Sequence, residues 1–164
     1  MQKYTLHKNF IEESVLNILS NWIDKNKHTF QDGGMGGNRV TSRFYDKIEY
    51  PKEVYEVQDK IEKKLNVTNL HFMAASCAYP GDHCYLHKDP IYKQGYDTFH
   101  CNLFLSNVEG GQPYVLKTPT EDDIIEFDKG DLLCYYVSKV YHGSKTLNKG
   151  ERKMWVFSFL IQNE

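Results

Sequence analysis

The sequence lacks the features that mark several large protein classes. Its 20 lysines and arginines are balanced by 22 aspartates and glutamates, so the formal net charge is −2. With no basic stripe, a nucleic-acid partner is not expected on electrostatic grounds. No run of about 18 apolar residues occurs, so no membrane span is expected. The first residues also lack the basic and then apolar pattern of a secretory signal.

Cysteine is scarce and shows neither a metal-binding nor a disulfide pattern. The four cysteines form no Cys-x-x-Cys pair and lie inside apolar segments typical of strands: Cys77, Cys84, Cys101 and Cys134. We therefore expect buried, reduced thiols, which fit a cytoplasmic protein. A zinc site with cysteine ligands is the alternative.

A glycine-rich stretch at residues 32–38 does not continue into the Gly-Lys-Ser/Thr of a phosphate-binding loop. We interpret it as a connecting loop, and a lid over a substrate cleft is the functional alternative for Gly33–Gly37. Arg39 and Arg43 follow this stretch. They are expected to be solvated charges, with contact to an anionic substrate as the alternative.

The residues that are present fit one domain over 1–164 that is rich in β-structure. Of the 164 residues, 40% are apolar and 26% charged, which is ordinary for a single globular domain. Aromatic residues make up 14% of the chain and favour a pleated, half-buried surface.

Two helices are predicted in the first part of the chain. The first is predicted to start at Asn9 as N-cap, with Glu12 three residues on in a variant of the capping box. The second starts near Pro51, a favoured first helical residue. Apolar residues recur at helical spacing in both segments: Phe10, Ile11, Val15, Ile18, Leu19, Trp22 and Ile23 in the first, and Val54, Val57, Ile61 and Leu65 in the second.

From Asn69 onward, short apolar runs alternate with turn signals such as Pro80-Gly81 and Lys129-Gly130. The predicted strands are 70–78, 83–89, 98–105, 113–117, 122–127, 131–137 and 152–162. Helices followed by strands indicate a β-sandwich or barrel with helices packed on one face. The helical cover is expected over about 9–65 and the β core over about 69–162.

Potential metal ligands lie at the end of the second predicted strand. Side chains two apart share one face of a strand, so His83, Tyr85, His87 and Asp89 are expected to point the same way. His87 and Asp89 could then reach one metal ion, with His142 supplying a second imidazole. Two imidazoles and one carboxylate leave open positions on Fe(II), as non-haem oxygenases require. Zinc accepts the same ligand set, so the ligands alone do not choose the metal.

Arg152 lies ten residues past His142, at the start of the last predicted strand. Its guanidinium can bind a carboxylate in bidentate fashion, which suits the distal carboxylate of a 2-oxoacid. Lys153 is next in the chain and should face the opposite way.

These residues, in this order, resemble the 2-oxoglutarate/Fe(II)-dependent dioxygenase superfamily, and most of all its prolyl-hydroxylase branch. The matching segments are Ala78-Tyr79-Pro80-Gly81, Tyr85-Leu86-His87-Lys88-Asp89, His142 and Arg152. The resemblance implies a double-stranded β-helix (jelly-roll) core and Fe(II) bound by His87, Asp89 and His142. It also implies a salt bridge from Arg152 to 2-oxoglutarate and a place for Tyr79 near the co-substrate and metal.

Two positions depart from this branch. Phe104 stands where hypoxia-type prolyl hydroxylases carry a co-substrate-binding tyrosine, so Asn102, on the same face as His100, is expected to make that contact instead. Met154 stands where many members have a small hydroxyl residue. Asp89 is retained, whereas related halogenases replace it, so halogenation is disfavoured.

Some candidate residues keep an alternative. His100 is the rival of His142 as third ligand. Tyr85 either lines the cleft or only packs, and Tyr79 is either a site residue or a turn aromatic. His83 is expected to be structural or at the surface and not a metal ligand.

The resemblance implies hydroxylation of a C–H bond with Fe(II), 2-oxoglutarate and O₂, and with ascorbate as an accessory reductant. It favours a prolyl residue in a peptide or protein as substrate, and then a free amino acid or another small metabolite. A non-enzymatic jelly-roll module that binds a metal or small ligand is the alternative from another class.

Overall fold

The computed structural model of the chain describes residues 3–32, 40–41, 49–121 and 123–163. The Gly33–Gly37 loop, Arg39 and Arg43 lie outside the described residues, and so do the predictions made for them. The elements in chain order are β1 (Thr5–His7), α1 (Glu13–Asn26), the short 3₁₀ helix η1 (Lys27–Thr29), β2 (Gln31–Asp32), β3 (Val40–Thr41), α2 (Lys52–Leu65), β4 (Leu70–Ala78), β5 (Cys84–His87), β6 (Tyr96–Phe104), β7 (Glu109–Gly110), β8 (Pro113–Leu116), β9 (Leu132–Tyr136), β10 (Tyr141–Ser144), β11 (Leu147–Lys149) and β12 (Arg152–Gln162).

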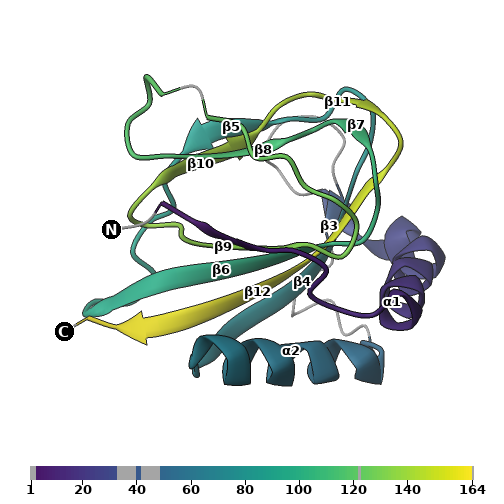
Figure 1. Ribbon diagram of the computed structural model, residues 1–164, viewed down its shortest axis with the longest axis horizontal. Coiled ribbons are helices and arrows are strands. Elements are labelled where there is room, and N and C mark those ends of the chain that lie inside the picture. The colour runs from purple at the N-terminus through teal and green to yellow at the C-terminus, as the bar shows by residue number, and fades with distance from the viewer. Residues whose placement is uncertain (1–2, 33–39, 42–48, 122, 164) are drawn as a thin grey trace.

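The strands form two facing sheets, with helices outside the larger one (Figure 1). The larger sheet has seven strands in the order β1-β9-β6-β12-β4-β3-β2, and the smaller has the order β5-β10-β8. A further pair, β11-β7, closes one end. This arrangement confirms the predicted jelly-roll core with helices on one face. Among the described residues, no helix is long and apolar enough to cross a bilayer.

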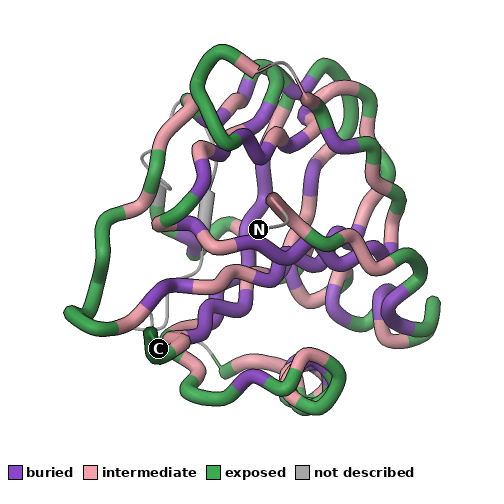
Figure 2. Tube along the Cα trace, turned by 60° about the vertical axis from the view of Figure 1, so that its left-hand side comes forward, coloured by how far each residue is buried: buried purple, intermediate pink, exposed green. Residues whose placement is uncertain are grey.

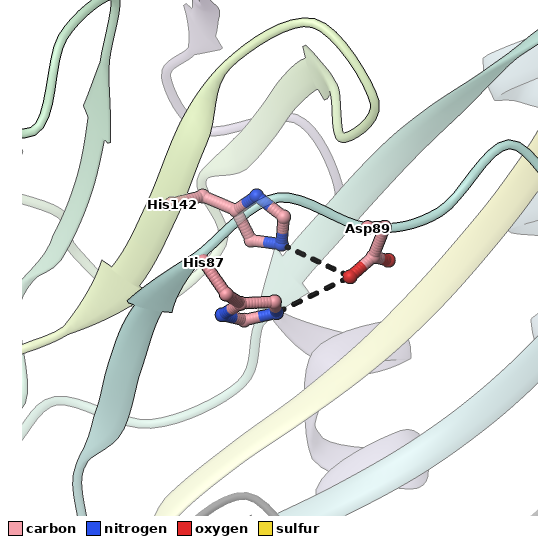
Figure 3. A group of neighbouring side chains, drawn as sticks. All are labelled: His87, Asp89 and His142. Atoms are coloured by element: carbon pink, nitrogen blue, oxygen red, sulfur yellow. Dashed lines mark ion pairs between the residues drawn. The ribbon is translucent and has the colours of Figure 1, made fainter.

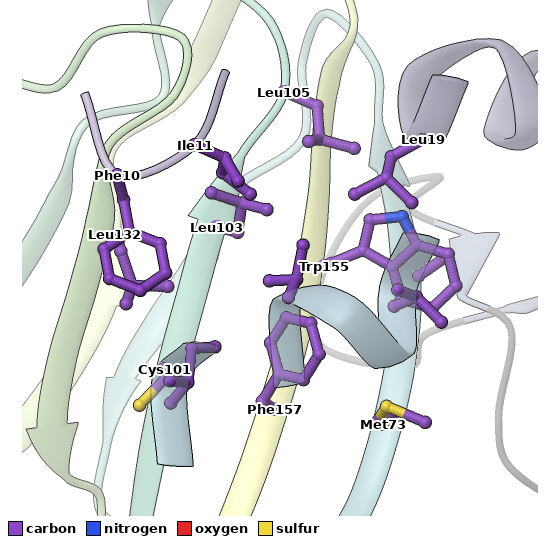
Figure 4. Packing of buried hydrophobic residues seen from close by; sticks show 14 of the residues in the cluster. Phe10, Ile11, Leu19, Met73, Cys101, Leu103, Leu105, Leu132, Trp155 and Phe157 are labelled. Atoms are coloured by element: carbon purple, nitrogen blue, oxygen red, sulfur yellow. The ribbon is translucent and has the colours of Figure 1, made fainter. Parts of the chain in front are cut away.

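Strand β12 shows how alternation divides the molecule into a helix side and a site side. Trp155, Phe157 and Phe159 are fully buried in the cluster shared with the helices. Figure 4 shows Trp155 and Phe157 within this cluster. Met154 and Val156 alternate with these residues along the strand and face the space between the two sheets. Burying each large side chain contributes roughly 1.5–3 kcal/mol, so this helix-side cluster holds the larger sheet in place beneath the site.

Helix α2 follows the predicted pattern closely. Its stripe of Val54, Val57 and Ile61 is buried, whereas most of its other positions are half-buried or exposed (Figure 2). The helix ends at Asn66, which adopts the left-handed conformation at φ 51° that asparagine tolerates at a C-cap. The helix therefore packs through one face only.

The predicted start of the first helix was wrong. Asn9 has φ 48°, and the N-cap is Glu12. The N–H of Phe10 donates to the carbonyl of Gly130 at 2.7 Å, and the N–H of Asn9 donates to the buried carboxylate of Asp131 at 3.1 Å. These contacts hold residues 9 and 10 outside the helix, so tertiary pairing overrides the local capping signal.

One predicted strand was also wrong. Within the described part of 122–127, Ile124 forms an isolated bridge with Tyr114 instead of a strand. Conversely, β10 appears where only a connection before His142 was expected. Gly143 and Ser144 have weak strand propensity, and the segment becomes extended because β5 and β8 pair with it on both sides.

Candidate metal centre

The two histidines of the candidate centre lie opposite each other on neighbouring strands of the smaller sheet. Strands β5 and β10 are antiparallel, and His142 lies directly opposite His87. The two imidazole rings are 4.3 Å apart between centroids. Strand pairing therefore brings together two residues that are far apart in the sequence.

Asp89 joins them from the segment that follows β5. Its backbone N–H donates to the carbonyl of Val137 at 3.1 Å, which holds this segment against the end of β9. One carboxylate oxygen, Oδ1, lies 3.2 Å from Nε2 of His87 and 3.7 Å from Nε2 of His142 (Figure 3). The ligand atoms of these three residues all lie within 4.8 Å of one another.

This spacing fits a transition metal ion. Bonds of about 2.0–2.2 Å to nitrogen and oxygen place two ligands at right angles about 3 Å apart. The Nδ1 atoms of both rings point at backbone carbonyls, at 2.7 Å from Tyr85 for His87 and at 3.4 Å from Val140 for His142. An Nδ1–H that donates to a carbonyl leaves Nε2 as the metal-binding atom. Burial lowers the pKa of His142, so the ring is neutral and available to a metal.

A bulge in β5 overturns the predicted alternation around these ligands. His142 pairs with His87, but Ser144 pairs with Cys84, so β5 takes three steps where β10 takes two. As a result Cys84 lines the cavity, and Tyr85 is 64% exposed. The prediction that Tyr85 shares the ligand face was therefore wrong. The ring of His83 packs against that of Tyr85, which fits its predicted structural role.

The centre opens into a cavity of about 320 Å³ between the two sheets. The smaller sheet and the Asp89 segment contribute His87, Asp89, His142, Cys84 and Ser144. The larger sheet contributes mostly apolar and aromatic side chains with a few polar groups among them: Phe72, Ala74, Ser76, His100, Asn102, Phe104, Tyr135, Arg152, Met154 and Val156. Mostly apolar walls with a few convergent polar groups are typical of a small-molecule site.

Arg152 supplies a buried positive charge to this cavity. It is 6% exposed and begins β12 opposite Ala78 on β4. Its Nη1 donates to the carbonyl of Gly111 at 2.5 Å, which fixes one edge of the guanidinium. Lys153 faces the helix side, where its Nζ lies 2.6 Å from Asp24 of α1. The two neighbouring cations therefore lie on opposite faces of β12, as predicted.

Asn102 lies in the cavity next to a tyrosine that the sequence argument missed. Its Nδ2 lies 3.1 Å from the hydroxyl of Tyr135, while its Oδ1 is buried and without a partner among the described residues. Burial raises the pKa of Tyr135, so the hydroxyl keeps its proton. In either orientation of the amide, the pair retains one donor for a ligand: the tyrosine O–H or the amide N–H. The position of Tyr135 on predicted strand 131–137 was the available signal.

Tyr79 is not brought to the cavity. It continues the alternation of β4 after Cys77, and that register faces the helices. Its ring packs against the helix-side cluster, and Nζ of Lys27 lies 5.9 Å from the ring centroid. Burial, together with the neighbouring thiol of Cys77, raises the pKa of Tyr79 to about 12. The structure thus supports the alternative that it is a turn aromatic.

Comparison with solved structures finds the same fold in several prolyl hydroxylases. The viral collagen prolyl hydroxylase of Paramecium Bursaria Chlorella virus-1, in complex with 2OG, gives a TM-score of 0.75 at 16% identity, over 98% of this chain and 97% of that chain. A prolyl-4-hydroxylase of Pseudomonas putida gives 0.76 at 12% identity, over 100% and 95%. A Trichoplax adhaerens prolyl hydroxylase, bound to a hypoxia inducible factor peptide fragment, gives 0.74 at 14%, over 96% and 83%.

No protein-family model matches the chain, and no curated protein matches it in sequence. The structural likeness therefore establishes the fold: the chain has the jelly-roll of the 2-oxoglutarate/Fe(II) oxygenases, as the sequence motifs predicted. Because one fold serves many functions, the function has to come from the residues of the site.

Proposed function

We propose that the protein is a 2-oxoglutarate- and Fe(II)-dependent oxygenase that hydroxylates a C–H bond, with a prolyl residue of a peptide as the favoured substrate. The observation that carries this proposal is that the candidate metal ligands and a buried arginine line the same cavity. It holds a His-Asp-His cluster with metal-ligand spacing and a buried arginine, Arg152, in the fold of the prolyl hydroxylases.

His87, Asp89 and His142 would hold the metal ion. Two neutral imidazoles and one carboxylate offer three ligands and leave open positions for a co-substrate and oxygen. When bound, Fe(II) couples decarboxylation of 2-oxoglutarate to oxidation of the C–H bond, which is chemistry that side chains alone cannot supply. The protein orients the three ligands through the contacts of the two Nδ1 atoms with backbone carbonyls and through the backbone hydrogen bond from Asp89 to Val137.

Arg152 would bind the distal carboxylate of 2-oxoglutarate. Its charge is buried, and a buried cation is stabilised by an anionic partner and by hydrogen bonds. The spare donor of the Asn102–Tyr135 pair would bind a further co-substrate oxygen. Phe104 and Met154 wall this part of the cavity with apolar surface and keep water from the co-substrate.

A prolyl peptide is proposed as substrate because of the activity of one similar protein and the bound peptide of another. One is a collagen prolyl hydroxylase, and another was solved with a bound peptide fragment. We also infer a reducing, cytoplasmic location, because all four cysteines are buried and unpaired by disulfides.

Fe(II)-dependent formation of succinate from 2-oxoglutarate tests the proposal. Wild-type protein is expected to form succinate and to form it faster with a prolyl peptide, whereas His142→Ala and Asp89→Ala are inactive. His28→Ala, at an exposed surface position, is the matched control and should equal the wild type. Stimulation by a free amino acid instead of a peptide would reassign the substrate. If metal binds but succinate never forms, the proposal of an enzyme is refuted in favour of a non-enzymatic binding module.

A further inference from the structure

The end of the cavity away from Arg152 carries a histidine that the metal and co-substrate leave unused. His100 lies on β6, opposite Ser158 of β12 and Tyr135 of β9. Residues 152 and 158 are six positions apart on β12, which is about 20 Å along a strand. Since 2-oxoglutarate is anchored at Arg152, the His100 end is available to the second substrate.

This end of the cavity has aromatic walls. The ring of Phe72 meets that of His100 edge-on, at 5.6 Å between centroids. Tyr92 lines the same cavity and is 49% exposed, so it marks a side that is open to solvent. Its hydroxyl lies 3.4 Å from Oδ2 of Asp89, which places this opening beside the metal ligands. A substrate group that entered past Tyr92 would lie between the candidate metal centre and His100.

The imidazole of His100 has a hydrogen-bonding atom to offer. Its Nε2 is buried and has no partner among the described residues. A buried polar atom left unsatisfied costs free energy, and such atoms are rare unless a ligand or water completes them. Burial lowers the pKa of His100 to about 3, so the ring is neutral. A neutral imidazole suits an amide or hydroxyl better than an ion.

The charged residues of the cavity also favour an uncharged substrate group. Among its described lining residues, the charged side chains are Arg152 and Asp89, and the proposed function uses both. A zwitterionic substrate would lose its hydration without gaining an opposite charge from these residues. A group inside a peptide carries only neutral amides and avoids that cost.

We propose that His100 is a specificity-determining residue, which hydrogen-bonds an uncharged group of the C–H substrate at the end of the cavity away from Arg152. This inference rests on the proposed function, because it assumes that 2-oxoglutarate occupies the Arg152 end.

The test uses two small probes that differ in charge, N-acetyl-L-prolinamide and free L-proline. Each is titrated into the anaerobic Fe(II)–2-oxoglutarate protein, and its dissociation constant is measured by calorimetry. The uncharged probe is expected to bind at least about tenfold more tightly, and His100→Phe should weaken it about tenfold, because one hydrogen bond is lost. His100→Gln, which keeps a donor and an acceptor, should restore most of the binding. His28→Phe, the same change on the surface, should have no effect.

The affinity for 2-oxoglutarate, measured first in every variant, separates the two proposals. If wild-type protein does not bind 2-oxoglutarate, the proposed function fails. If 2-oxoglutarate binds equally to wild type and His100→Phe but the uncharged probe does not bind, or binds both proteins equally, the role of His100 is refuted. Tighter binding of free proline, or a loss in His100→Gln as large as in His100→Phe, refutes it as well.

Discussion

Replacing Arg152 tests the assignment of the cavity's two ends. Arg152→Met removes a charge that is 6% exposed and faces the cavity from the first residue of β12. Removing one partner of a buried, hydrogen-bonded charge pair costs about 2–5 kcal/mol, or roughly 30-fold to several thousand-fold in affinity. The carbonyl of Gly111 already accepts one N–H of the guanidinium, so we expect the lower part of this range, about 100-fold for 2-oxoglutarate.

The assay is an anaerobic titration of the Fe(II) protein with 2-oxoglutarate, followed by the visible charge-transfer absorption. Arg152→Lys keeps the charge but loses the planar fork, so its affinity should fall between wild type and Arg152→Met. Lys153→Met removes the neighbouring cation, which pairs with Asp24 on the helix side, and should leave the affinity within about twofold. The assignment of Arg152 is refuted if Arg152→Met binds 2-oxoglutarate like wild type, or if Lys153→Met loses as much affinity as Arg152→Met.

Three further predictions concern the structure around the site. Gly143→Ala should weaken Fe(II) binding about tenfold or more, as measured by titration. Gly143 follows His142, and a Cβ at this position would lie 2.6 Å from the carbonyl oxygen of Cys84, so the strand that carries His142 would have to shift. Unchanged affinity would contradict this packing. Phe157→Ala should lower the free energy of unfolding by about 3–5 kcal/mol in urea denaturation, since this ring is fully buried, and a loss below 1 kcal/mol would argue against the helix-side cluster. Iodoacetamide at pH 8 should leave Cys77 unmodified until the protein unfolds, as seen by mass spectrometry, because burial raises the pKa of this thiol to about 11 and keeps it protonated; rapid labelling of folded protein would be the contrary result.

The long strands of the larger sheet were predictable because their signals are local. Strands 70–78 and 152–162 match β4 and β12 at both ends, since segments made largely of apolar and aromatic residues mark strands buried on both faces. The same alternation predicted that Arg152 and Lys153 face opposite ways. It also placed His100, Asn102 and Phe104 on one face, and all three line the cavity.

The errors arose where a contact distant in sequence decides the conformation. Asparagine is favoured as an N-cap, but the hydrogen bonds of Asn9 to the carboxylate of Asp131 and of Phe10 to the carbonyl of Gly130 hold this segment outside the helix. The bulge in β5 is visible only from its register with β10, so the exposure of Tyr85 could not be deduced from alternation.

Two further features of the site also needed the fold. Tyr79 matched the motif, but its strand register faces the helices. Tyr135 carries no motif of its own, and its pairing with Asn102 appears only when β6 and β9 lie side by side.

We propose that His87, Asp89 and His142 hold Fe(II) in a site that also binds 2-oxoglutarate. The most direct measurement is the visible absorption spectrum of the anaerobic protein with Fe(II) and 2-oxoglutarate. We expect a charge-transfer band in wild-type protein that disappears in His142→Ala and persists in the surface control His28→Ala. A flat spectrum in wild-type protein, or a band that His142→Ala retains in full, would contradict this metal site.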